Sequence, residues 1–504
     1  MSTTFKTTLA ALAVAATGGF ASAQISFQAP VGYPVGLQPD VTAIGDLDGD
    51  GDRDLATATD NPDKLSLLFN AGNGTFTGPV NVQLGNGTSP HAPIIGDLDG
   101  DGDADMAVTL KNVNQVRLVI NNGGTFTPGA TFAVGAEPRG MVAADLDNDG
   151  DLDLVVSNRE GNTVSVLRNG GGLSFTVTSI AAGQEPREVA VGDVTGDGLA
   201  DIVVAAHDSR QVIVLRNTGG ASFVQHATLP LSNEKPEGIA IALLDGNTTL
   251  DIVATADIND VEFAWVFLNN GGGSFGGATP YNLGGVLDAD TIATGDFDLD
   301  GDVDFVTSNQ DSGSISIMTN NGSGGFGAAQ VIGVGSQPNH VAAGFLDGNG
   351  SLDLVTTNEG SGNVSVLLNT NGGVACGATP YCQAKINSQG GAAQMGSSGT
   401  PSVSAQNFVI TVTGALPNNF GLLFYGTNGP SSQAFLGGTL CAAGPITRAG
   451  IQQLSPTGSA QYPTTVTPAM VGTTRWYQFF YRDPFHPDGF AASLSNALRV
   501  DFCQ

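Results

Sequence analysis

The sequence predicts an all-β protein, namely a seven-bladed β-propeller followed by a smaller β-sandwich-like domain. Three observations lead to this fold class. An acidic motif recurs seven times, with steps of 48 to 53 residues between copies. Each repeat holds several short apolar or alternating segments and none of helical length, and the repeats stop before a region that contains all four cysteines. A steady period of this size, built from strands alone, is typical of a ring of similar sheets.

The acidic motif is clearest at its first copy, GDLDGDGDRD, which begins at Gly45. Complete or nearly complete copies begin at Gly96, Ala144, Gly192 and Gly295, and two weaker copies that lack the first acid begin at Ala242 and Gly344. A short apolar run precedes and follows each copy. Each motif is therefore predicted to be the loop that joins two buried strands.

The third repeat shows how four strands fit into one period. The apolar runs Met141–Ala144 and Leu152–Val156 flank the acidic loop, and both are too short for helices. The segment Thr163–Leu167 alternates as a half-exposed strand does. A glycine-rich turn that ends at Phe175 opens a fourth strand. Four strands in one repeat predict one propeller blade.

The seventh repeat lacks this fourth strand, and the opposite end of the chain supplies a match for it. The segment ISFQAPVGYPVGLQP, at 25–39, resembles the tail of a repeat such as GTFTPGATFAVGAEP. We therefore expect the N-terminal segment to form the outer strand of the last blade and to close a propeller over residues 25–372. Closure of this kind protects sheet edges from aggregation.

The first residues predict export. They contain one lysine, an apolar run at Leu9–Ala16 and small residues at Ala21 and Ala23. This pattern indicates a signal peptide over residues 1–23, cleaved after Ala23, because the apolar run is too short to span a membrane. We expect a chain without a membrane span that is secreted or held at the cell surface as a monomer.

The charge distribution separates a second domain at residues 376–504. The net charge of −30 makes nucleic acid an unsuitable partner, yet from Cys376 onward five basic residues outnumber three acidic ones. The four cysteines of an exported domain predict two disulfides, with three connectivities open. Segments such as NFVITVTG and TRWYQFFYRD predict a β-sandwich. The aromatic run at 476–481 is expected in its core, with a carbohydrate platform as the alternative.

The acidic loops pose an electrostatic problem that a cation solves. Two carboxylates 4 to 5 Å apart repel by roughly 3 to 4 kcal/mol at an effective dielectric constant near 20. Either the loops stay open and solvated, or they fold around a hard divalent cation, and four complete copies in register favour calcium. An EF-hand is excluded, because position twelve is Thr57, Val108 and Val156 in the first three copies. Zinc is disfavoured by the all-oxygen ligands.

The repeats resemble a known family. The pattern D-x-D-x-D-G-x-x-D, the apolar strand after it and the Asn-Gly-Gly-x-Phe turn, as in NNGGTF at 121–126, are similar to the FG-GAP or VCBS-type repeats of exported bacterial proteins and to the integrin α propeller. LCAAGPITR and SNALRVDFC resemble a C-terminal domain that recurs in exported bacterial proteins.

The resemblance implies that loop positions one, three, five and nine give carboxylate ligands and that position seven gives a carbonyl. The implied ligands are Asp46, Asp48, Asp50 and Asp54; Asp97, Asp99, Asp101 and Asp105; Asp145, Asp147, Asp149 and Asp153; Asp296, Asp298, Asp300 and Asp304. The fourth loop keeps Asp193, Asp197 and Asp201 but has Thr195 at position three, so weaker binding is expected there. The loops that begin at Leu243 and Phe345 are expected to bind an ion poorly or not at all.

A ligand face is predicted on the opposite side of the ring. The residue after the proline that precedes each first strand, or after Ala289 in the sixth repeat, should lie at the mouth of the central channel. These residues are Asp40, His91, Arg139, Arg187, Glu237, Asp290 and Asn339. They mix both charges with an imidazole and an amide, as a binding face on a rigid scaffold does.

These features predict a calcium-binding adhesion module for an extracellular glycan or protein, and not an enzyme. The five histidines are scattered, and no H-E-x-x-H motif is present. The alternative is a polysaccharide-acting lyase or hydrolase that uses His91, Arg139 and Arg187 around the channel mouth.

Overall fold

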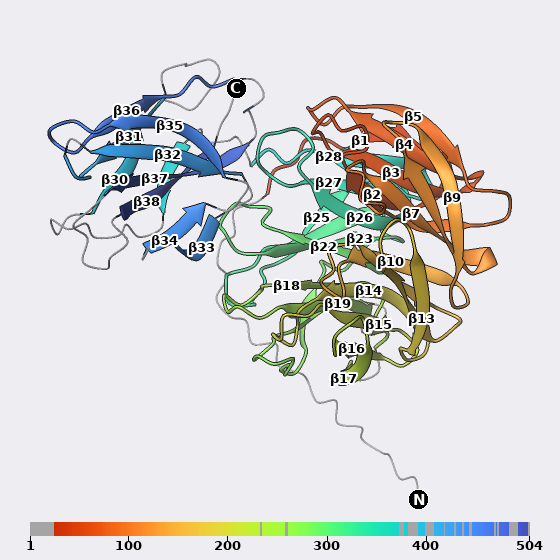
Figure 1. The fold of residues 1–504 in the computed structure, drawn as a ribbon. Coiled ribbons are helices and arrows are strands. Elements are labelled where there is room, and N and C mark those ends of the chain that lie inside the picture. Colours follow the sequence, from red (N-terminus) through yellow and green to blue (C-terminus); the bar gives the residue numbers. More distant parts are fainter. Residues whose placement is uncertain are drawn as a thin grey trace, which may run out of the picture.

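The computed structural model confirms the predicted fold class (Figure 1). It describes residues 25–231, 234–257, 261–371, 377–381, 392–398, 408–417, 419–427, 430–435, 438–442, 446–467, 470, 473–482 and 492–501. The predicted signal peptide and Cys376, Cys382 and Cys503 lie outside the described residues, as does the side chain of Cys441. Among the described residues, no helix has the length and apolar character needed to cross a membrane.

Residues 31–367 form seven antiparallel sheets of four strands. Named from the centre outward, six of them are β2 (Leu37–Gly45), β3 (Asp54–Asn61), β4 (Asp63–Asn70) and β5 (Phe76–Gln83); β6 (Pro90–Gly96), β7 (Asp105–Leu110), β8 (Gln115–Asn121) and β9 (Phe126–Ala133); β10 (Pro138–Ala144), β11 (Asp153–Asn158), β12 (Thr163–Asn169) and β13 (Phe175–Ala181); β14 (Pro186–Gly192), β15 (Asp201–Ala206), β16 (Gln211–Asn217) and β17 (Phe223–Pro230); β18 (Ile239–Ala242), β19 (Asp251–Asp257), β20 (Glu262–Phe267) and β21 (Thr279–Asn282); β22 (Ala289–Gly295), β23 (Asp304–Asn309), β24 (Ser314–Met318) and β25 (Gln330–Gly333). A short 3₁₀ turn, η1 (Lys111–Val113), joins β7 to β8.

The seventh blade combines the two ends of the propeller. It consists of β26 (Pro338–Gly344), β27 (Asp353–Asn358), β28 (Asn363–Leu367) and, as its outer strand, β1 (Val31–Pro34). β1 pairs antiparallel with β28, with Val31 opposite Val366 and Pro34 opposite Asn363. This outer strand is the one that the sequence analysis assigned to the N-terminal segment.

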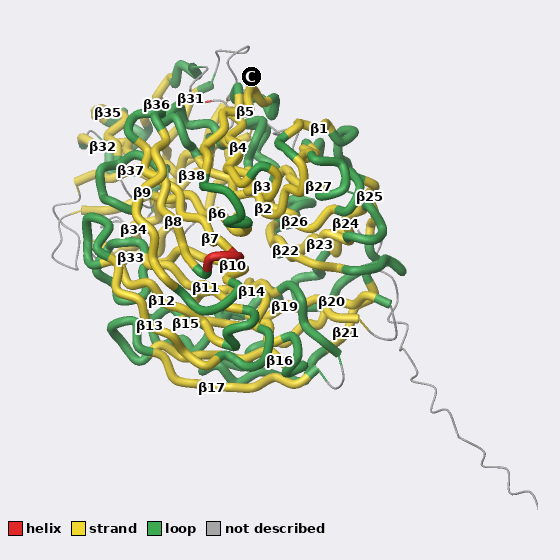
Figure 2. Tube along the Cα trace, turned by 90° about the vertical axis from the view of Figure 1, so that its right-hand side faces the viewer, coloured by secondary structure: helices red, strands yellow, loops and turns green. Residues whose placement is uncertain are grey.

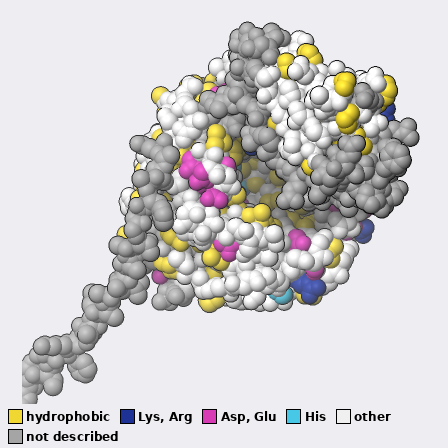
Figure 3. All heavy atoms as spheres, turned by 90° about the vertical axis from the view of Figure 1, so that its left-hand side faces the viewer, with side chains coloured by type: hydrophobic (Ala, Val, Ile, Leu, Met, Phe, Trp, Pro, Cys, Tyr) yellow, Lys and Arg dark blue, Asp and Glu magenta, His cyan; other side chains and the backbone are white. Residues whose placement is uncertain are grey.

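The first strands of the seven blades form the inner wall of the ring. Each contacts the first strands of the blades on both sides, and β26 contacts β2, so the circle is complete. Figure 2 shows the strands arranged around a central opening, and Figure 3 shows the other side of the ring, hollowed at its centre. The second strands are buried along almost their whole length, as in β11 and β15, because a blade packs against each of their faces.

The C-terminal region is a two-layered β structure. One sheet has the order β29 (Gly377–Tyr381), β38 (Ala492–Asp501), β37 (Thr474–Arg482), β32 (Phe420–Gly426) and β35 (Thr447–Gln453); the other has the order β30 (Gln394–Ser398), β31 (Val409–Thr413) and β36 (Ala460–Pro463); β33 (Pro430–Phe435) pairs with β34 (Gly438–Ala442). Met395 and Ile410 from the smaller sheet share one core with Phe479 and Leu498 from the larger sheet. In the aromatic run, Phe479 is fully buried in this core, which supports the core interpretation over the carbohydrate platform.

One buried aspartate holds each acidic loop to its own blade. The ninth-position residues are at most 1 % exposed: Asp54, Asp105, Asp153, Asp201, Asp251, Asp304 and Asp353. In the fifth blade, Oδ2 of Asp251 accepts a hydrogen bond from the Leu244 N–H at 2.8 Å, and Oδ1 accepts one from the Asn269 N–H at 2.7 Å. The same two bonds recur in all the blades, with Thr195 as the loop donor in the fourth.

An asparagine at the end of each third strand region then joins neighbouring blades. Asn269 Nδ2 donates to the Val194 carbonyl of the preceding blade at 2.8 Å and to the Leu250 carbonyl of its own blade at 3.0 Å. The equivalent bonds to the preceding blade measure 2.7 to 2.9 Å around the whole ring, made by Asn70, Asn121, Asn169, Asn217, Asn269, Asn320 and Asn369. We call the aspartate and asparagine of one blade the Asp–Asn clamp.

We expect Asn269→Ala to lower the free energy of unfolding of the propeller by about 2 to 4 kcal/mol, because two buried carbonyls lose their donor. Urea unfolding in chelator measures this effect without a contribution from bound ions. Asn270→Ala is the matched control, since the exposed Asn270 bonds only to the nearby Ser274 carbonyl. Equal stability of the two variants would contradict a role for the clamp between blades.

Candidate metal loops and channel mouth

The acidic loops and the predicted channel-mouth residues lie at opposite ends of the same strands. In the first blade, Asp40 is near the start of β2 and Asp46 directly follows its end. Six residues of strand span about 20 Å. The loops and the mouth therefore belong to opposite faces of the ring, as the sequence analysis expected.

The structure gathers three carboxylates in each of the four complete loops. In each group the oxygens lie within 4.8 Å of one another, and the groups are Asp46, Asp48 and Asp50; Asp97, Asp99 and Asp101; Asp145, Asp147 and Asp153; Asp296, Asp298 and Asp300. The first carboxylate also organises its loop, since the N–H groups of Gly49 and Gly51 donate to Asp46 at 2.8 and 3.0 Å. Gly51 has φ 97°, a conformation that requires glycine at this turn.

The chemistry of these groups fits a hard divalent cation. Oδ1 of Asp147 and Oδ1 of Asp296 are buried and accept no hydrogen bond from the residues that the structure describes. Burial, and next the neighbouring Asp300 carboxylate, raise the pKa of Asp298. Without a cation, partly buried neighbouring carboxylates resist ionisation, because their negative charges repel one another. A bound cation offsets this repulsion. An all-oxygen donor set is the one that calcium and magnesium take.

The ninth-position aspartate takes part in the Asp–Asn clamp, a role that the resemblance did not imply. In the first, second and sixth loops it lies outside the group of three, and both of its oxygens accept backbone N–H groups in the Asp–Asn clamp. In the third loop Asp153 joins the group, whereas Asp149 does not. The structure therefore assigns this aspartate first to the clamp, and only in the third blade also to the candidate metal group.

The third and fourth loops contain a cation of the protein itself. Arg216 Nε lies 3.0 Å from Asp197 Oδ2, and Arg168 Nε donates to Asp147 Oδ2. The equivalent residues in the first, second and sixth blades are Phe69, Ile120 and Thr319. Among the described residues, the fourth loop forms no group of three carboxylates. A guanidinium group thus compensates part of the loop charge in these two blades.

In the two weak loops, neutral side chains form hydrogen bonds where the complete loops have carboxylates. In the fifth, Asn247 Nδ2 and Thr249 Oγ1 donate to the Asn269 carbonyl at 3.2 and 2.7 Å. In the seventh, Asn349 Nδ2 and Ser351 Oγ donate to the Asn369 carbonyl at 2.7 and 3.0 Å. Their first positions, Leu243 and Phe345, are 45 % and 55 % exposed. These loops are therefore closed by neutral hydrogen bonds, and their poor binding of an ion stays a prediction.

We expect Arg168→Met to raise the affinity of the third loop for a divalent cation about tenfold, because it removes a positive charge close to the candidate site. Calorimetric titration of the metal-free protein measures the change. Arg216→Met is the control, since Thr195 still leaves the fourth loop short of a carboxylate. Unchanged affinity in Arg168→Met would show that this guanidinium does not compete with the ion.

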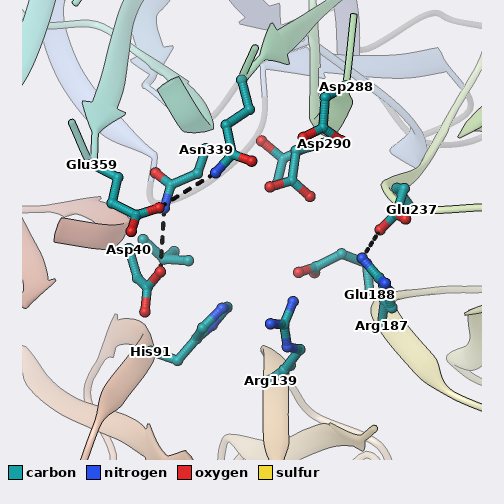
Figure 4. A pocket seen from close by; sticks show the side chains of 13 residues that line it. Asp40, His91, Arg139, Arg187, Glu188, Glu237, Asp288, Asp290, Asn339 and Glu359 are labelled. Atoms are coloured by element: carbon teal, nitrogen blue, oxygen red, sulfur yellow. Dashed lines mark hydrogen bonds and ion pairs between the residues drawn. The ribbon is translucent and has the colours of Figure 1, made fainter. Parts of the chain in front are cut away.

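All seven residues predicted at the channel mouth line one cavity of about 210 Å³. Figure 4 shows Asp40, His91, Arg139, Arg187, Glu237, Asp290 and Asn339 turned towards a common space. The cavity is also lined by Val41, Glu188, Asp288, Thr291, Gln310 and Glu359. Residues from all seven blades therefore converge at this mouth.

A repeated turn brings these side chains to the mouth. The residue two places before the mouth position has a positive φ, between 47° and 57°, in six of the seven repeats: Gln38, Ser89, Glu137, Glu185, Asp288 and Gln337. This left-handed residue redirects the chain just before the first strand. Alignment of the repeats on the preceding proline located this turn in the sequence but did not reveal its left-handed residue.

Sequence reasoning missed Glu188, which lies one residue after the mouth position. The equivalent residues in the two adjacent blades are Gly140 and Gly238. A Cβ atom at Gly140 would lie 2.6 Å from Oε2 of Glu188, so this glycine provides the space for the carboxylate. The sequence signal for Glu188 was an acidic residue at a position where both adjacent repeats have glycine. Asp288, Gln310 and Glu359 come from loops that the register did not include.

Burial at the mouth changes the protonation of several groups. It raises the pKa of Glu188 to about 7, although Arg139 partly offsets this shift. Burial, and then the Glu237 carboxylate, also raise the pKa of Asp290 well above its usual range. Burial lowers the pKa of His91, and Lys111 and Arg139 add to this effect. Burial therefore favours the neutral form of the imidazole and of both carboxyl groups.

Salt bridges surround the cavity and neutralise part of its charge. Lys111 Nζ lies 2.8 Å from Asp40 Oδ2, and Arg187 pairs with Glu237, which also contacts His207 Nε2 at 2.9 Å. Glu185, His207 and Asp208 have the spacing of metal ligands. However, Arg159 and Lys235 already pair with the two carboxylates, at 3.5 and 2.5 Å. We interpret this group as a salt-bridge cluster.

We expect Glu188→Gln to stabilise the protein at pH 8 and to leave its stability at pH 4 nearly unchanged. Because the folded-state pKa of about 7 lies above the ordinary glutamate value of 4.5, the protonated form favours folding. The stability that protonated Glu188 contributes is fully present below pH 4.5 and is lost as the pH rises through the folded-state value of about 7. The gain at pH 8 should reach at most about 3 kcal/mol. Thermal unfolding of both proteins across pH measures it, and pH-independent melting differences would contradict the shift.

Comparisons with known proteins are consistent with this geometry. The FG-GAP-like repeat pattern matches six overlapping segments, at residues 46–108, 107–156, 145–204, 193–254, 244–307 and 296–356. A comparison with curated proteins finds no match.

Similar solved structures have little sequence in common with this chain. The crystal structure of BBS1N in complex with ARL6DN has a TM-score of 0.50 and 16 % identity, and the match covers 68 % of this chain and 96 % of that one. The WD40 domain of Toxoplasma gondii coronin has a TM-score of 0.47 and 10 % identity, with coverage of 69 % and 87 %. A protein from Lactobacillus plantarum has a TM-score of 0.44 and 15 % identity, with coverage of 59 % and 86 %. At these identities the likeness to BBS1N concerns the fold alone.

Proposed function

Since the chain belongs to the family of proteins with FG-GAP-like repeats, we propose that it is an exported, calcium-stabilised propeller that binds an extracellular glycan or protein. Binding takes place at the channel mouth, on the face opposite the acidic loops. The protein acts outside the cell or at its surface as an adhesion or recognition module. The C-terminal domain, with two disulfides, is an accessory unit.

One observation carries this proposal. Side chains from all seven blades line a single polar cavity, and some of its buried groups have no partner among the described residues. Nδ1 of His91 and Oδ1 of Asn339 are unbonded although each side chain belongs to a residue only 8 % exposed. Buried polar groups without partners are costly, so a site that contains them is suited to a ligand that supplies the missing bonds.

The acidic loops, on the opposite face of the ring, can stabilise the binding face through the inner strands. The orphaned oxygens of Asp147 and Asp296 favour a cation, and its hard-oxygen donors favour calcium in an extracellular setting. Each loop joins the first strand of a blade to the second. Bound calcium would therefore fix the inner strands whose opposite ends form the mouth.

We expect chelation to lower the melting temperature of the purified protein by about 10 °C or more relative to millimolar calcium, since several ions bind only the folded state. Mass spectrometry should detect calcium in the untreated protein. Asp46→Asn should reduce the ion content. Asp52→Asn is the matched control, because it also removes one loop charge but leaves the predicted carbonyl ligand. An unchanged melting temperature and no detected ion would refute the calcium proposal.

The binding function is tested on glycan and protein arrays, with and without chelator. The expected result is binding that His91→Ala or Asn339→Ala abolishes and that Leu243→Ala, on the opposite face, preserves. Binding that tolerates both mouth variants but requires Leu243 would place the ligand on the wrong face and contradict the proposal.

A second candidate is a polysaccharide-acting enzyme. The observation in its favour is the pair of mouth carboxyls with raised pKa, Glu188 at about 7 and Asp290 well above its usual range. Release of reducing ends from the array glycans tests it. If Glu188→Gln retains binding but loses turnover, the enzyme is supported. If no turnover is found with any glycan that binds, the binding module is supported.

A further inference from the structure

The channel mouth contains more carboxylates than its own cations neutralise. Asp40 and Glu237 are paired with Lys111 and Arg187, and Glu359 accepts a hydrogen bond from Gln310 at 3.4 Å. In contrast, within the described part of the chain no basic side chain lies within salt-bridge distance of Glu188, Asp288 or Asp290. Three acceptor groups from the fourth and sixth blades thus face the cavity unpaired (Figure 4).

A neutral acceptor from the seventh blade points into the same space. Asn339 Nδ2 donates to the Pro39 carbonyl and to Asp40 Oδ1, both at 3.2 Å. These two bonds fix the amide so that its Oδ1 is left for the cavity, and this atom has no partner among the described residues. Asn339 is 8 % exposed, as is His91 across the cavity, whose Nδ1 is also unbonded. The unsatisfied groups on the side of Asp290 are therefore all acceptors.

The arrangement does not suit a single metal ion. The three carboxylates are absent from the groups whose oxygens lie within 4.8 Å of one another in the described residues, whereas the loops on the opposite face form such groups. A larger cation is needed to reach acceptors that are spread over three blades.

The chemistry of a primary ammonium group matches these acceptors. An ammonium carries three donors, no acceptor and a compact charge at the end of a flexible chain. A guanidinium prefers one coplanar carboxylate in a bidentate pair, and here the carboxylates are separate. A sugar ring commonly packs on an aromatic side chain, yet among the described residues no tryptophan, tyrosine or phenylalanine lines the cavity. The cavity of about 210 Å³ accommodates an alkyl chain with its amine.

On the basis of the proposed binding function, we propose that the channel mouth recognises a primary ammonium group on a flexible alkyl chain, with Glu188, Asp288, Asp290 and Asn339 as its acceptors. The source is either a lysine side chain of a protein partner or a free alkyl diamine. Arg139 and His91, on the other side of the cavity, contact the remainder of the ligand. The net charge of −30 attracts a cationic ligand towards the protein.

Calorimetry on the full calcium-loaded chain tests this assignment with four probes. N-acetyl-lysine methylamide represents a lysine side chain, and cadaverine represents a free diamine. N-acetyl-norleucine methylamide, which lacks the amine, and glucosamine, which presents an amine on a sugar ring, are the controls. We expect the two alkyl amines to bind and the two controls not to bind. Binding of lysine amide in preference to cadaverine identifies a protein partner, and the reverse identifies a free diamine.

Variants separate specific recognition from general attraction. Glu188→Gln and Asp290→Asn should each weaken amine binding about tenfold or more, because each replaces a carboxyl group that can ionise beside the ammonium with a neutral amide. Both variants keep the size and the polarity of the side chain, so they should fold, and thermal unfolding verifies this. Asp52→Asn removes one charge on the opposite face and should leave binding unchanged. If Asp52→Asn weakens binding as much as Asp290→Asn does, the amines respond only to net charge and the proposal is wrong.

Two further outcomes distinguish this inference from the proposed function. If an array ligand requires His91 and Asn339 but lysine amide and cadaverine neither bind nor compete, the ammonium assignment fails and the binding function stands. If neither the array nor the amines reveal binding at the mouth, both fail. Binding of glucosamine in preference to the alkyl amines would also overturn the assignment.

Discussion

The Asp–Asn clamp is the constraint on which the rest of the propeller depends. In each blade a buried carboxylate accepts one backbone N–H from the acidic loop and one from the asparagine beyond the third strand. The same asparagine donates to a loop carbonyl of the preceding blade. These bonds are short and buried, so the loss of either partner would leave a buried polar group unsatisfied. They unite loop, blade and neighbouring blade around the full circle, and they are present whether or not a loop has its other acids.

Because the clamp holds the frame, the tips of the loops are free to differ. Blades one, two and six keep the acids of a cation site, and blades three and four add an arginine that contacts a loop aspartate. Blades five and seven use asparagine, threonine and serine to reach the same backbone carbonyl. One loop geometry is therefore stabilised in three ways: by carboxylates suited to an ion, by a guanidinium and by neutral hydrogen bonds. The mouth at the opposite end of the strands shows the same principle, since a constant turn presents a different side chain in each blade.

Much of this structure was predictable because it is repeated. The seven acidic loops, the four strands of each blade, the contribution of the N-terminal segment to the last blade and the seven mouth residues all follow from one register. Features that depend on contacts between segments distant in the sequence, within a blade or between blades, were not predictable. The second role of Asp54 and its equivalents required the partner N–H groups to be seen, and the position of Arg168 in the third loop comes from a strand that follows that loop. Glu188 was hidden because the space for its carboxylate is provided by Gly140, a residue of the preceding repeat.

The composition of the seventh blade has a consequence for how the chain is made. β1 lies opposite β28, and Val31 pairs with Val366, so this sheet unites nearly the first and the last residues of the propeller. Contacts between such distant segments form slowly, because a long stretch of chain has to be ordered before they are gained. A chain emerging from a ribosome or an export channel has its first strand long before it has the partner of that strand. Until residue 366 has emerged, the first strands of the blades cannot close into a ring. Any truncation before residue 366 leaves the N-terminal segment and two blade edges without partners.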